Sequence, residues 1–300
     1  MLHSFNYILF LKKHLPMKLQ LEIAYFKKHH KFVNLRNPKT LNEKIVSSML
    51  YGYKPFHTTV ADKYLVREYV QEKIGCQYLI PLIKVIDDAK DFTIDDLPKS
   101  FIIKSNNGSG NNKIVKNKNN IDINEVRALI NDWLSKDYYS SSYQPEYKDI
   151  KSKVLIEKLL FDSNGKVPND YKFHCIKGKV EFIQIIEDRF ENPQTRFYYT
   201  DWKQCPFFLE PIGSHFTFKS FKETMKSKHA INRTDQPNNL NDMIDVAERL
   251  ASDFDYVRID LYSLHDVIYF GEITLHPYGG MNRFVPEYFD LYYGGKCQSM

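Results

Sequence analysis

A stretch near the C-terminal end of the chain, FDYVRIDLYSLHDVIYFGEITLHPYGG, alternates polar with apolar residues. Its polar members include Arg258, Asp260, Glu272 and Thr274. Two carboxylates side by side repel each other unless a cation lies between them, and carboxylate oxygens beside phosphate groups are typical ligands of Mg²⁺. The pattern therefore predicts a magnesium site. The alternative is a surface salt-bridge cluster of Arg258, Asp260 and Glu272.

The alternation has the period of two half-buried strands joined by a turn at residues 263–266. Asp260 and Glu272 share a face only if the loop has an odd length or one strand carries a one-residue bulge. In the second strand we expect Phe270 to alternate onto the polar side, together with Glu272 and Thr274. The hairpin must therefore be irregular to gather its charges.

A second candidate site begins at Lys104, the last residue of the short apolar run FIIK. The loop SNNGSGNN follows, with Asn107, Gly108, Ser109 and Gly110 at its centre. Glycines and short polar residues let successive backbone amides converge on phosphate oxygens, and a lysine adds charge. The P-loop pattern GxxxxGK[ST] is absent. The alternative is an ordinary hairpin loop leading into residues 113–116.

Three further segments carry candidate binding residues. The apolar strand at 154–160 ends in Glu157, Lys158 and Leu159, where a strand end is able to read an adenine with its backbone; a plain core strand is the alternative. Lys172 shares one face of a predicted hairpin with Asp170 and is a candidate phosphate ligand. Lys63 lies on a helix predicted from about Thr58, with a solvated lysine as the alternative.

Composition places the chain among folded proteins of one large or two medium domains. It has 300 residues, a net charge of +5 and four cysteines without CxxC spacing. The mild charge suits an anionic small ligand or a membrane surface and not duplex nucleic acid, and the cysteines favour a reducing compartment. The basic helix predicted over residues 1–31 is either docked on the body or lies at a membrane interface.

The order of elements predicts an α+β fold in three parts. Residues 1–95 form a helical N-terminal region, in which Thr40 and Glu43 make a capping box and Cys76–Val85 contains a strand interrupted at Pro81. Residues 96–160 hold the Gly/Ser/Asn loop, and residues 161–300 hold the charged hairpin. We expect a loop at 138–148 and an irregular insertion at 210–239.

Seven stretches taken together resemble the ATP-grasp superfamily, and more closely its TupA-like group from bacterial surface-polysaccharide and teichuronopeptide loci. They cover roughly residues 35–290 and read NPKTLNEKI, ADKYLVREYV, FIIKSNNGSGNN, DYKFHCIKGKVEFIQ, DRF, FYYTDWK and VRIDLYS…IYFGEITLHPYGG. The resemblance implies two α+β subdomains that clasp ATP, with a helical N-terminal region. Thr274 departs from the pattern, because many superfamily members have Asn there and a hydroxyl is a weaker Mg²⁺ ligand than an amide oxygen.

The resemblance also implies roles for these residues. Lys63, Lys104 and the loop would bind phosphates, Glu157 to Leu159 the adenine and ribose, and Lys172 the terminal phosphates. Asp260, Glu272 and Thr274 would hold Mg²⁺, with Arg258 beside an acyl phosphate.

The resemblance implies a carboxylate–amine ligase in the cytoplasm or at the inner membrane face. It would join an amino acid to a hexuronic acid on a glycan or on its lipid- or nucleotide-linked precursor. A glycan-modifying phospho- or glycosyltransferase and a non-catalytic nucleotide-binding protein are the alternatives.

Overall fold

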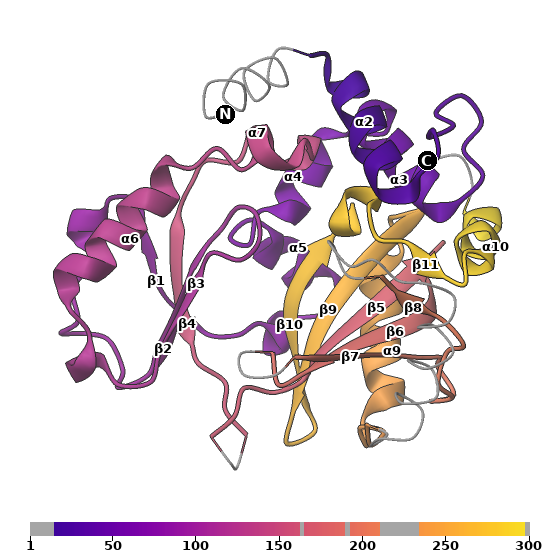
Figure 1. The fold of residues 1–300 in the computed structure, drawn as a ribbon. Helices are drawn as coiled ribbons and strands as arrows, with labels where there is room; N and C mark the ends of the chain where they lie inside the picture. The colour runs from indigo at the N-terminus through magenta and orange to yellow at the C-terminus, as the bar shows by residue number, and fades with distance from the viewer. Residues whose placement is uncertain (1–14, 163–164, 190–192, 211–233, 298–300) are drawn as a thin grey trace. The chain divides into compact units, whose positions relative to one another are not determined.

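The computed structural model describes residues 15–162, 165–189, 193–210 and 234–297. The chain divides into two compact units. Unit 2 comprises residues 54–205 and 235–275, and unit 1 comprises the described residues of 1–53, 206–234 and 276–300. Figure 1 shows the elements along the chain. The division into residues 1–95, 96–160 and 161–300 that the sequence suggests stays a prediction.

The first sheet of unit 2 is antiparallel and four-stranded. In spatial order its strands are β1 (Leu82–Ile86), β4 (Val154–Lys158), β2 (Phe101–Ser105) and β3 (Asn112–Val115). Alternate residues of β2, Phe101 and Ile103, are fully buried in a cluster shared with α6 (Ile123–Ser135). Because strand side chains alternate between faces, Lys104 belongs to the other face of the sheet. β1 begins directly after Pro81, which cannot donate to the ladder.

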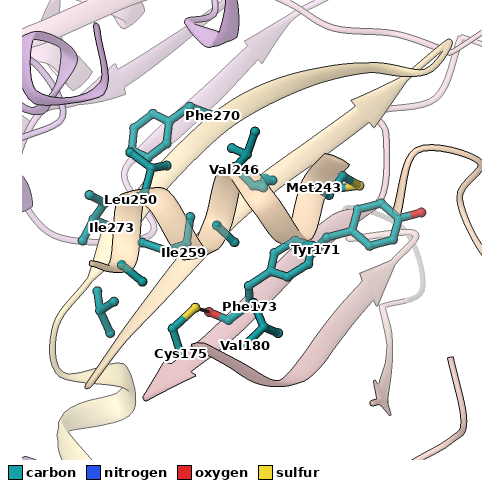
Figure 2. Packing of buried hydrophobic residues seen from close by; sticks show 14 of the residues in the cluster. Tyr171, Phe173, Cys175, Val180, Met243, Val246, Leu250, Ile259, Phe270 and Ile273 are labelled. Atoms are coloured by element: carbon teal, nitrogen blue, oxygen red, sulfur yellow. Dashed lines mark hydrogen bonds between the residues drawn. The ribbon is translucent and has the colours of Figure 1, made fainter. Parts of the chain in front are cut away.

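The second sheet of unit 2 is antiparallel and five-stranded. In spatial order its strands are β10 (Val267–Thr274), β9 (Tyr256–Leu264), β5 (Asp170–Ile176), β6 (Lys179–Glu187) and β7 (Gln194–Tyr198). Helix α9 (Leu240–Ala251) covers one face, where its apolar stripe packs on residues such as Phe173 and Ile259 (Figure 2). The charged residues of these strands therefore lie on the face that α9 leaves uncovered.

The sequence predicted either an odd-length loop or a one-residue bulge, and the hairpin of β9 and β10 contains the bulge. Glu272 pairs with Asp260 and Phe270 pairs with Leu261, so Gly271 is the extra residue. One expectation was wrong: Phe270 is buried in the core beneath α9 and does not share the face of Glu272. The bulge changes the phase of the alternation at Gly271, and sequence periodicity alone does not show where such a change occurs.

The helix expected from about Thr58 is broken in two. Helix α4 (Pro55–Ala61) ends before Asp62, and α5 (Val66–Lys73) begins after it. The Asp62 carboxylate accepts hydrogen bonds from the amides of Tyr64 and Leu65, at 2.7 and 3.3 Å. Asp side chains compete with the helical pattern in this way, so the break is built into the sequence.

Unit 1 is mainly helical. It contains α2 (Met17–His29), α3 (Leu41–Tyr51), α10 (Tyr288–Lys296) and a two-stranded sheet of β8 (Phe208–Leu209) and β11 (Phe284–Val285). The predicted capping box of Thr40 and Glu43 is confirmed at the start of α3. Asn42 of α3 donates to Asp290 of α10 from both its backbone and its side chain, at 2.9 and 3.0 Å.

The remaining elements are short. They are η1 (Cys76–Tyr78), η2 (Ala89–Asp91), η3 (Lys118–Asn120), α7 (Tyr139–Ser142), η4 (Pro145–Tyr147) and η5 (Pro277–Gly280). The segment at 138–148, expected to be a loop, thus includes α7 and η4. Residues 1–14 of the predicted N-terminal helix and most of the insertion predicted at 210–239 lie outside the described residues.

Candidate nucleotide and metal site

A cleft lies in unit 2, lined by residues of both sheets. Ten of the fourteen predicted site residues line it: Lys63, Lys104, Gly108, Ser109, Gly110, Glu157, Lys158, Leu159, Asp260 and Glu272. The other four, Asn107, Lys172, Arg258 and Thr274, are not part of its wall. Residues from five separate segments therefore meet in one cavity.

A row of polar and charged side chains runs across adjacent strands of the second sheet, and Asp260 and Glu272 connect it to the cleft. Lys172 of β5 pairs with Asp260 of β9, and Asp260 pairs with Glu272 of β10. His174 and Thr274 flank Arg258 in the next row, two residues along. Residues that are neighbours in register share a face, so all these polar groups lie on one side of the sheet.

These groups form an unbroken series of ion pairs with alternating sign. Lys172 Nζ lies 2.8 Å from Asp170 Oδ2 and also contacts Asp260. Asp170 in turn pairs with Arg189, 2.7 Å away. Asp170, Lys172 and Asp260 are each at most 3% exposed. Burial acts to lower the pKa of Lys172, but the neighbouring carboxylates more than offset it and the pKa is raised. Lys172 is therefore charged at neutral pH.

Arg258 lies between the two carboxylates of the predicted metal site. Its Nε is 2.6 Å from Asp260, and its Nη2 lies 3.0 Å from both Glu272 and the hydroxyl of Thr274. The alternative reading of a salt-bridge cluster is therefore correct about the pairing. It is wrong about the surface, since Arg258 is only 6% exposed and Asp260 only 2%.

Two carboxylates on the cleft wall provide the hard oxygen donors that Mg²⁺ prefers, so the residues fit a divalent cation. Within the described ranges, no three His, Cys, Asp or Glu side chains are grouped as a metal site. For a bound cation the protein would supply two carboxylates, those of Asp260 and Glu272, and Mg²⁺ commonly takes its other ligands from water and phosphate.

Lys63 is held in the cleft by the glycine-rich loop. Its ammonium donates to the carbonyl of Gly108 at 2.5 Å and lies 3.9 Å from Glu272. Burial, together with the charge of Lys104, lowers the pKa of Lys63, and Glu272 partly offsets this. An anionic ligand strongly stabilises the charged form of a lysine that has lost its hydration and lies near a second lysine.

Asn106 fixes the position of this loop. Its side-chain amide donates to Asp62 at 2.9 Å, and its side-chain oxygen accepts from the amide of Lys153 at 2.8 Å. Its carbonyl accepts from the amide of Lys63 at 2.9 Å. The residue is fully buried. The loop, the break between α4 and α5, and the segment before β4 are therefore joined at one side chain.

Lys104 pairs with Glu157, with 2.6 Å between Nζ and Oε2, and Arg67 pairs with the other oxygen at 3.4 Å. Glu157 lies beside Ile102 in register and is 2% exposed. The predicted base-binding strand end therefore carries an ion-paired glutamate. Apolar residues surround it in the cleft: Ile80, Ile102, Ile114, Leu159, Leu160 and Val167.

Tyr138 closes over the loop. A side chain at Gly108 would meet its ring at 2.4 Å, and Gly108 has a φ of +68°. The Tyr138 hydroxyl lies 3.0 Å from the hydroxyl of Ser109. Gly108 is thus required both by its left-handed backbone and by the ring above it.

His174 is a packed histidine. It is stacked on Phe182 with the ring centroids 4.2 Å apart and makes hydrogen bonds to Tyr256 and Gln184, at 2.9 and 3.3 Å. Burial, and then the charge of Arg258, lower its pKa well below the usual value. It is a neutral member of the site.

Sequence reasoning did not assign four residues of this network: Asp62, Arg67, Asp170 and Arg189. Asp170 had a visible signal, because it alternates onto the face of Lys172. Arg189 follows the end of β6 and lines the cleft, and its only signal was the short stretch DRF, to which no role was assigned. The roles of Asp62 and Arg67 depend on the broken helix, which periodicity does not predict.

Comparisons with known proteins identify one family and several similar solved structures. A family model described as TupA-like ATPgrasp matches residues 43–298. A D-alanine–D-alanine ligase from Bacillus anthracis complexed with ATP is 13% identical, with a TM-score of 0.38, and the match covers 73% of this chain and 54% of that one.

Two other solved structures are similar. The ATP-grasp ligase PsnB complexed with a minimal precursor is 12% identical (TM-score 0.39; 74% and 54% covered). An ADP complex of an N5-carboxyaminoimidazole ribonucleotide synthetase is 10% identical (TM-score 0.39; 73% and 45% covered). This chain thus spans about half the length of these structures. No curated protein matches it.

Proposed function

Because this chain belongs to the TupA-like ATP-grasp family, as its sequence predicted, we propose that it is an ATP- and Mg²⁺-dependent ligase that joins a carboxylate to an amine. One observation carries the proposal. Lys63 and Lys104 meet the carboxylates of Asp260 and Glu272 in a single cleft, although the four residues come from distant parts of the sequence. Two cations beside two anions suit a ligand that brings both phosphate and metal.

The cleft has room and chemistry for a nucleotide. Its apolar residues, among them Ile80 and Ile114, suit a flat base, and Lys158 and Leu159 follow at the strand end. The lysines and the glycine loop suit the phosphates, because short residues leave backbone amides accessible. Tyr138 and Ser109 would close the loop over the phosphate chain.

Asp260 and Glu272 would hold the metal ion, which when bound would neutralise charge on the phosphates and orient them. Arg258 now occupies the space between these carboxylates and would remain beside them. Lys172 is held by two carboxylates and would stay charged throughout. Catalysis of this kind is mostly positioning and charge neutralisation, so no nucleophilic side chain is needed.

The reaction would proceed in two steps. A carboxylate oxygen of the acceptor attacks the γ-phosphorus of ATP, the bond to the bridging oxygen breaks, and ADP leaves. An amine then attacks the carbonyl carbon of the acyl phosphate, phosphate leaves with its oxygen, and the amine nitrogen loses a proton. Arg258 and Lys172 would offset the negative charge that develops on the transferred group.

For the substrates we propose a hexuronic acid, on a surface glycan or its lipid- or nucleotide-linked precursor, and an amino acid that supplies the amine. This part rests on the family relationship. The work of such an enzyme would take place in the cytoplasm, where ATP and activated sugars are available.

The first test is calorimetry of ATP binding with and without Mg²⁺, on the unchanged protein and on Glu272→Gln. We expect binding that requires Mg²⁺ and is at least about tenfold weaker in the variant, because a charge-assisted contact is lost. Glu248→Gln is the matched control, since Glu248 pairs with Lys179 at the edge of α9. Absence of ATP binding to the unchanged protein would refute the proposal.

The second test identifies the reaction. ADP release is measured with glucuronic acid and amino acids, each alone and together. A ligase releases ADP and phosphate only when both are present and yields a product whose mass equals their sum less one water. Transfer of phosphate to the sugar, without an amine, would instead indicate a phosphotransferase.

A further inference from the structure

The charge of the chain is concentrated at its N-terminal end. Residues 1–40 contain eight Lys and Arg and a single acidic residue, a net charge of +7. The other 260 residues contain 34 basic and 36 acidic side chains, a net charge of −2. The positive charge of the whole protein therefore belongs to one short segment, and the cleft of unit 2 does not account for it.

Helix α2 and the residues after it present this charge beside exposed apolar side chains. Leu19 and Phe26 lie seven residues apart, two helical turns, and are 40% and 43% exposed. Phe32 is 80% exposed, and its ring lies 4.9 Å from that of Phe26. Lys27 and Lys28 follow Phe26 directly. Large apolar side chains left in water at a basic helix end indicate a binding surface.

Helix α10 of the same unit extends this surface. Lys31, at the end of α2, pairs with Glu287, the residue that precedes α10. Three α10 side chains are largely exposed: Tyr288 (64%), Leu291 (53%) and Tyr292 (44%). Lys296 lies over the ring of Tyr292, 4.9 Å from its centroid. Aromatic rings with basic neighbours thus continue along a second helix.

We propose that this basic aromatic face, made of Leu19, Phe26, Lys27, Lys28 and Phe32 with Tyr288, Leu291 and Tyr292, docks the protein on an anionic lipid surface. Lysines are attracted to anionic headgroups, while phenylalanine and tyrosine rings enter the boundary between headgroups and acyl chains. No described helix is long and apolar enough to cross a membrane.

The combination of side chains favours lipid over nucleic acid. Nucleic acid binding depends on lysines and arginines that follow a phosphate backbone, and it gives no reason for exposed Leu19 and Leu291 beside them. A lipid surface accounts for both the charge and the apolar side chains. The inference is independent of the reaction that the cleft catalyses.

The test is cosedimentation of the full-length protein with vesicles of phosphatidylglycerol and phosphatidylcholine in roughly equal parts. We expect binding to these vesicles, weak binding to pure phosphatidylcholine, and loss of binding at high salt. Lys27→Glu/Lys28→Glu should weaken binding at least about 30-fold, because each lysine near an anionic surface contributes substantially. Lys99→Glu/Lys136→Glu, equal in charge and placed in unit 2, should have no effect beyond about twofold.

A second variant separates apolar insertion from charge. Phe26→Ser/Phe32→Ser keeps every lysine and should weaken binding about tenfold or more. ATP binding and the unfolding midpoint of each variant show that it is folded. Equal binding to both vesicle types, or equal loss in the control variant, would overturn the proposal. So would binding to duplex DNA with none to either vesicle.

Discussion

The backbone amide of Lys63 donates to the carbonyl of Asn106 across 2.9 Å, and this single bond places the lysine against the glycine-rich loop. It forms only because α4 ends before Asp62, so that the amide of Lys63 is not used within a helix. The Asp62 side chain both produces that break and binds Asn106. The arrangement of the lysine thus depends on two residues outside the cleft wall.

We therefore expect Asn106→Ala to weaken ATP binding about tenfold or more, although Asn106 is not expected to touch the nucleotide. The substitution leaves buried partners of Asn106 unsatisfied, so the free energy of unfolding should also fall by about 2–4 kcal/mol. Calorimetry and chemical denaturation measure the two effects. Asn119→Ala, at an exposed position in η3, is the control. Unchanged ATP affinity in a folded Asn106→Ala protein would contradict the positioning role.

The lowered pKa of Lys63 predicts that ATP binding depends on pH. Burial lowers its pKa in the free protein from 10.5, and a bound phosphate should raise the pKa again. At a pH between the pKa of Lys63 in the free protein and its pKa in the complex, ATP binding takes up a proton. The affinity for ATP should therefore fall as the pH rises into the alkaline range. Calorimetry in buffers of different ionisation enthalpy measures this uptake. Lys63→Met should remove it, whereas Lys158→Met, at an exposed lysine on the same cleft, should not.

The tight packing around Gly271 predicts that one added methyl group at this position would disturb the hairpin. A Cβ there would lie 3.0 Å from the carbonyl oxygen of Asp260 and 3.1 Å from the ring of Tyr262. Gly271→Ala should therefore displace the bulge and weaken Mg²⁺-dependent ATP binding, and should lower the free energy of unfolding by about 1–3 kcal/mol. At Gly295 a Cβ would meet nothing within 4 Å. Gly295→Ala should accordingly be neutral or slightly stabilising by the same measurements.

Two buried groups of unit 1 predict opposite effects of pH on stability. Burial raises the pKa of Asp290 from 3.8 to about 6, and the hydrogen bonds from Asn42 oppose this only in part. Between these two pKa values Asp290 holds a proton in the folded state that it lacks in the unfolded state, so this group makes the protein less stable as the pH rises.

His29 has the opposite effect. Burial lowers the pKa of His29 from 6.5 to about 4, partly offset by the Gly280 carbonyl. Between these two pKa values His29 holds a proton only in the unfolded state, so stability rises with pH.

Each effect amounts to about 3 kcal/mol over its window, and in the unchanged protein they largely cancel. Relative to that protein, Asp290→Asn should make the free energy of unfolding rise more steeply between about pH 4 and 6. His29→Gln should make it rise less steeply or fall. Urea denaturation at a series of pH values measures both slopes. Slopes that change in the same direction in the two variants would be inconsistent with this assignment.

The hairpin shows how much of the site could be predicted from the sequence. Alternation identified both strands, and the need for Asp260 and Glu272 to share a face predicted a bulge. It did not locate the bulge, and the alternation placed Phe270 on the wrong side. The reason is physical: a bulge changes the phase of the pattern at one residue, and the residues on either side still alternate.

The broken helix shows where sequence reasoning failed. Val60, Val66 and Val70 have helical spacing because α4 and α5 both pack on the core, so the apolar pattern continues across the break. The interruption is caused by Asp62, whose partners include Asn106, 44 residues further along. Contacts between segments so distant in sequence leave no local pattern. For the same reason Arg189 was not assigned to the site.

The division of the chain between its units has a consequence for synthesis on the ribosome. Asn42 of α3 pairs with Asp290, 248 residues later, and Gly280 packs against Val46 of the same helix. At typical rates of translation, about 5–20 residues per second, α3 waits roughly 12–50 s for these partners. During that interval Ile45 and Val46, fully or nearly fully buried in the finished protein, have no cover from the C-terminal segment. The apolar face of α3 thus needs protection from aggregation while the rest of the chain is made.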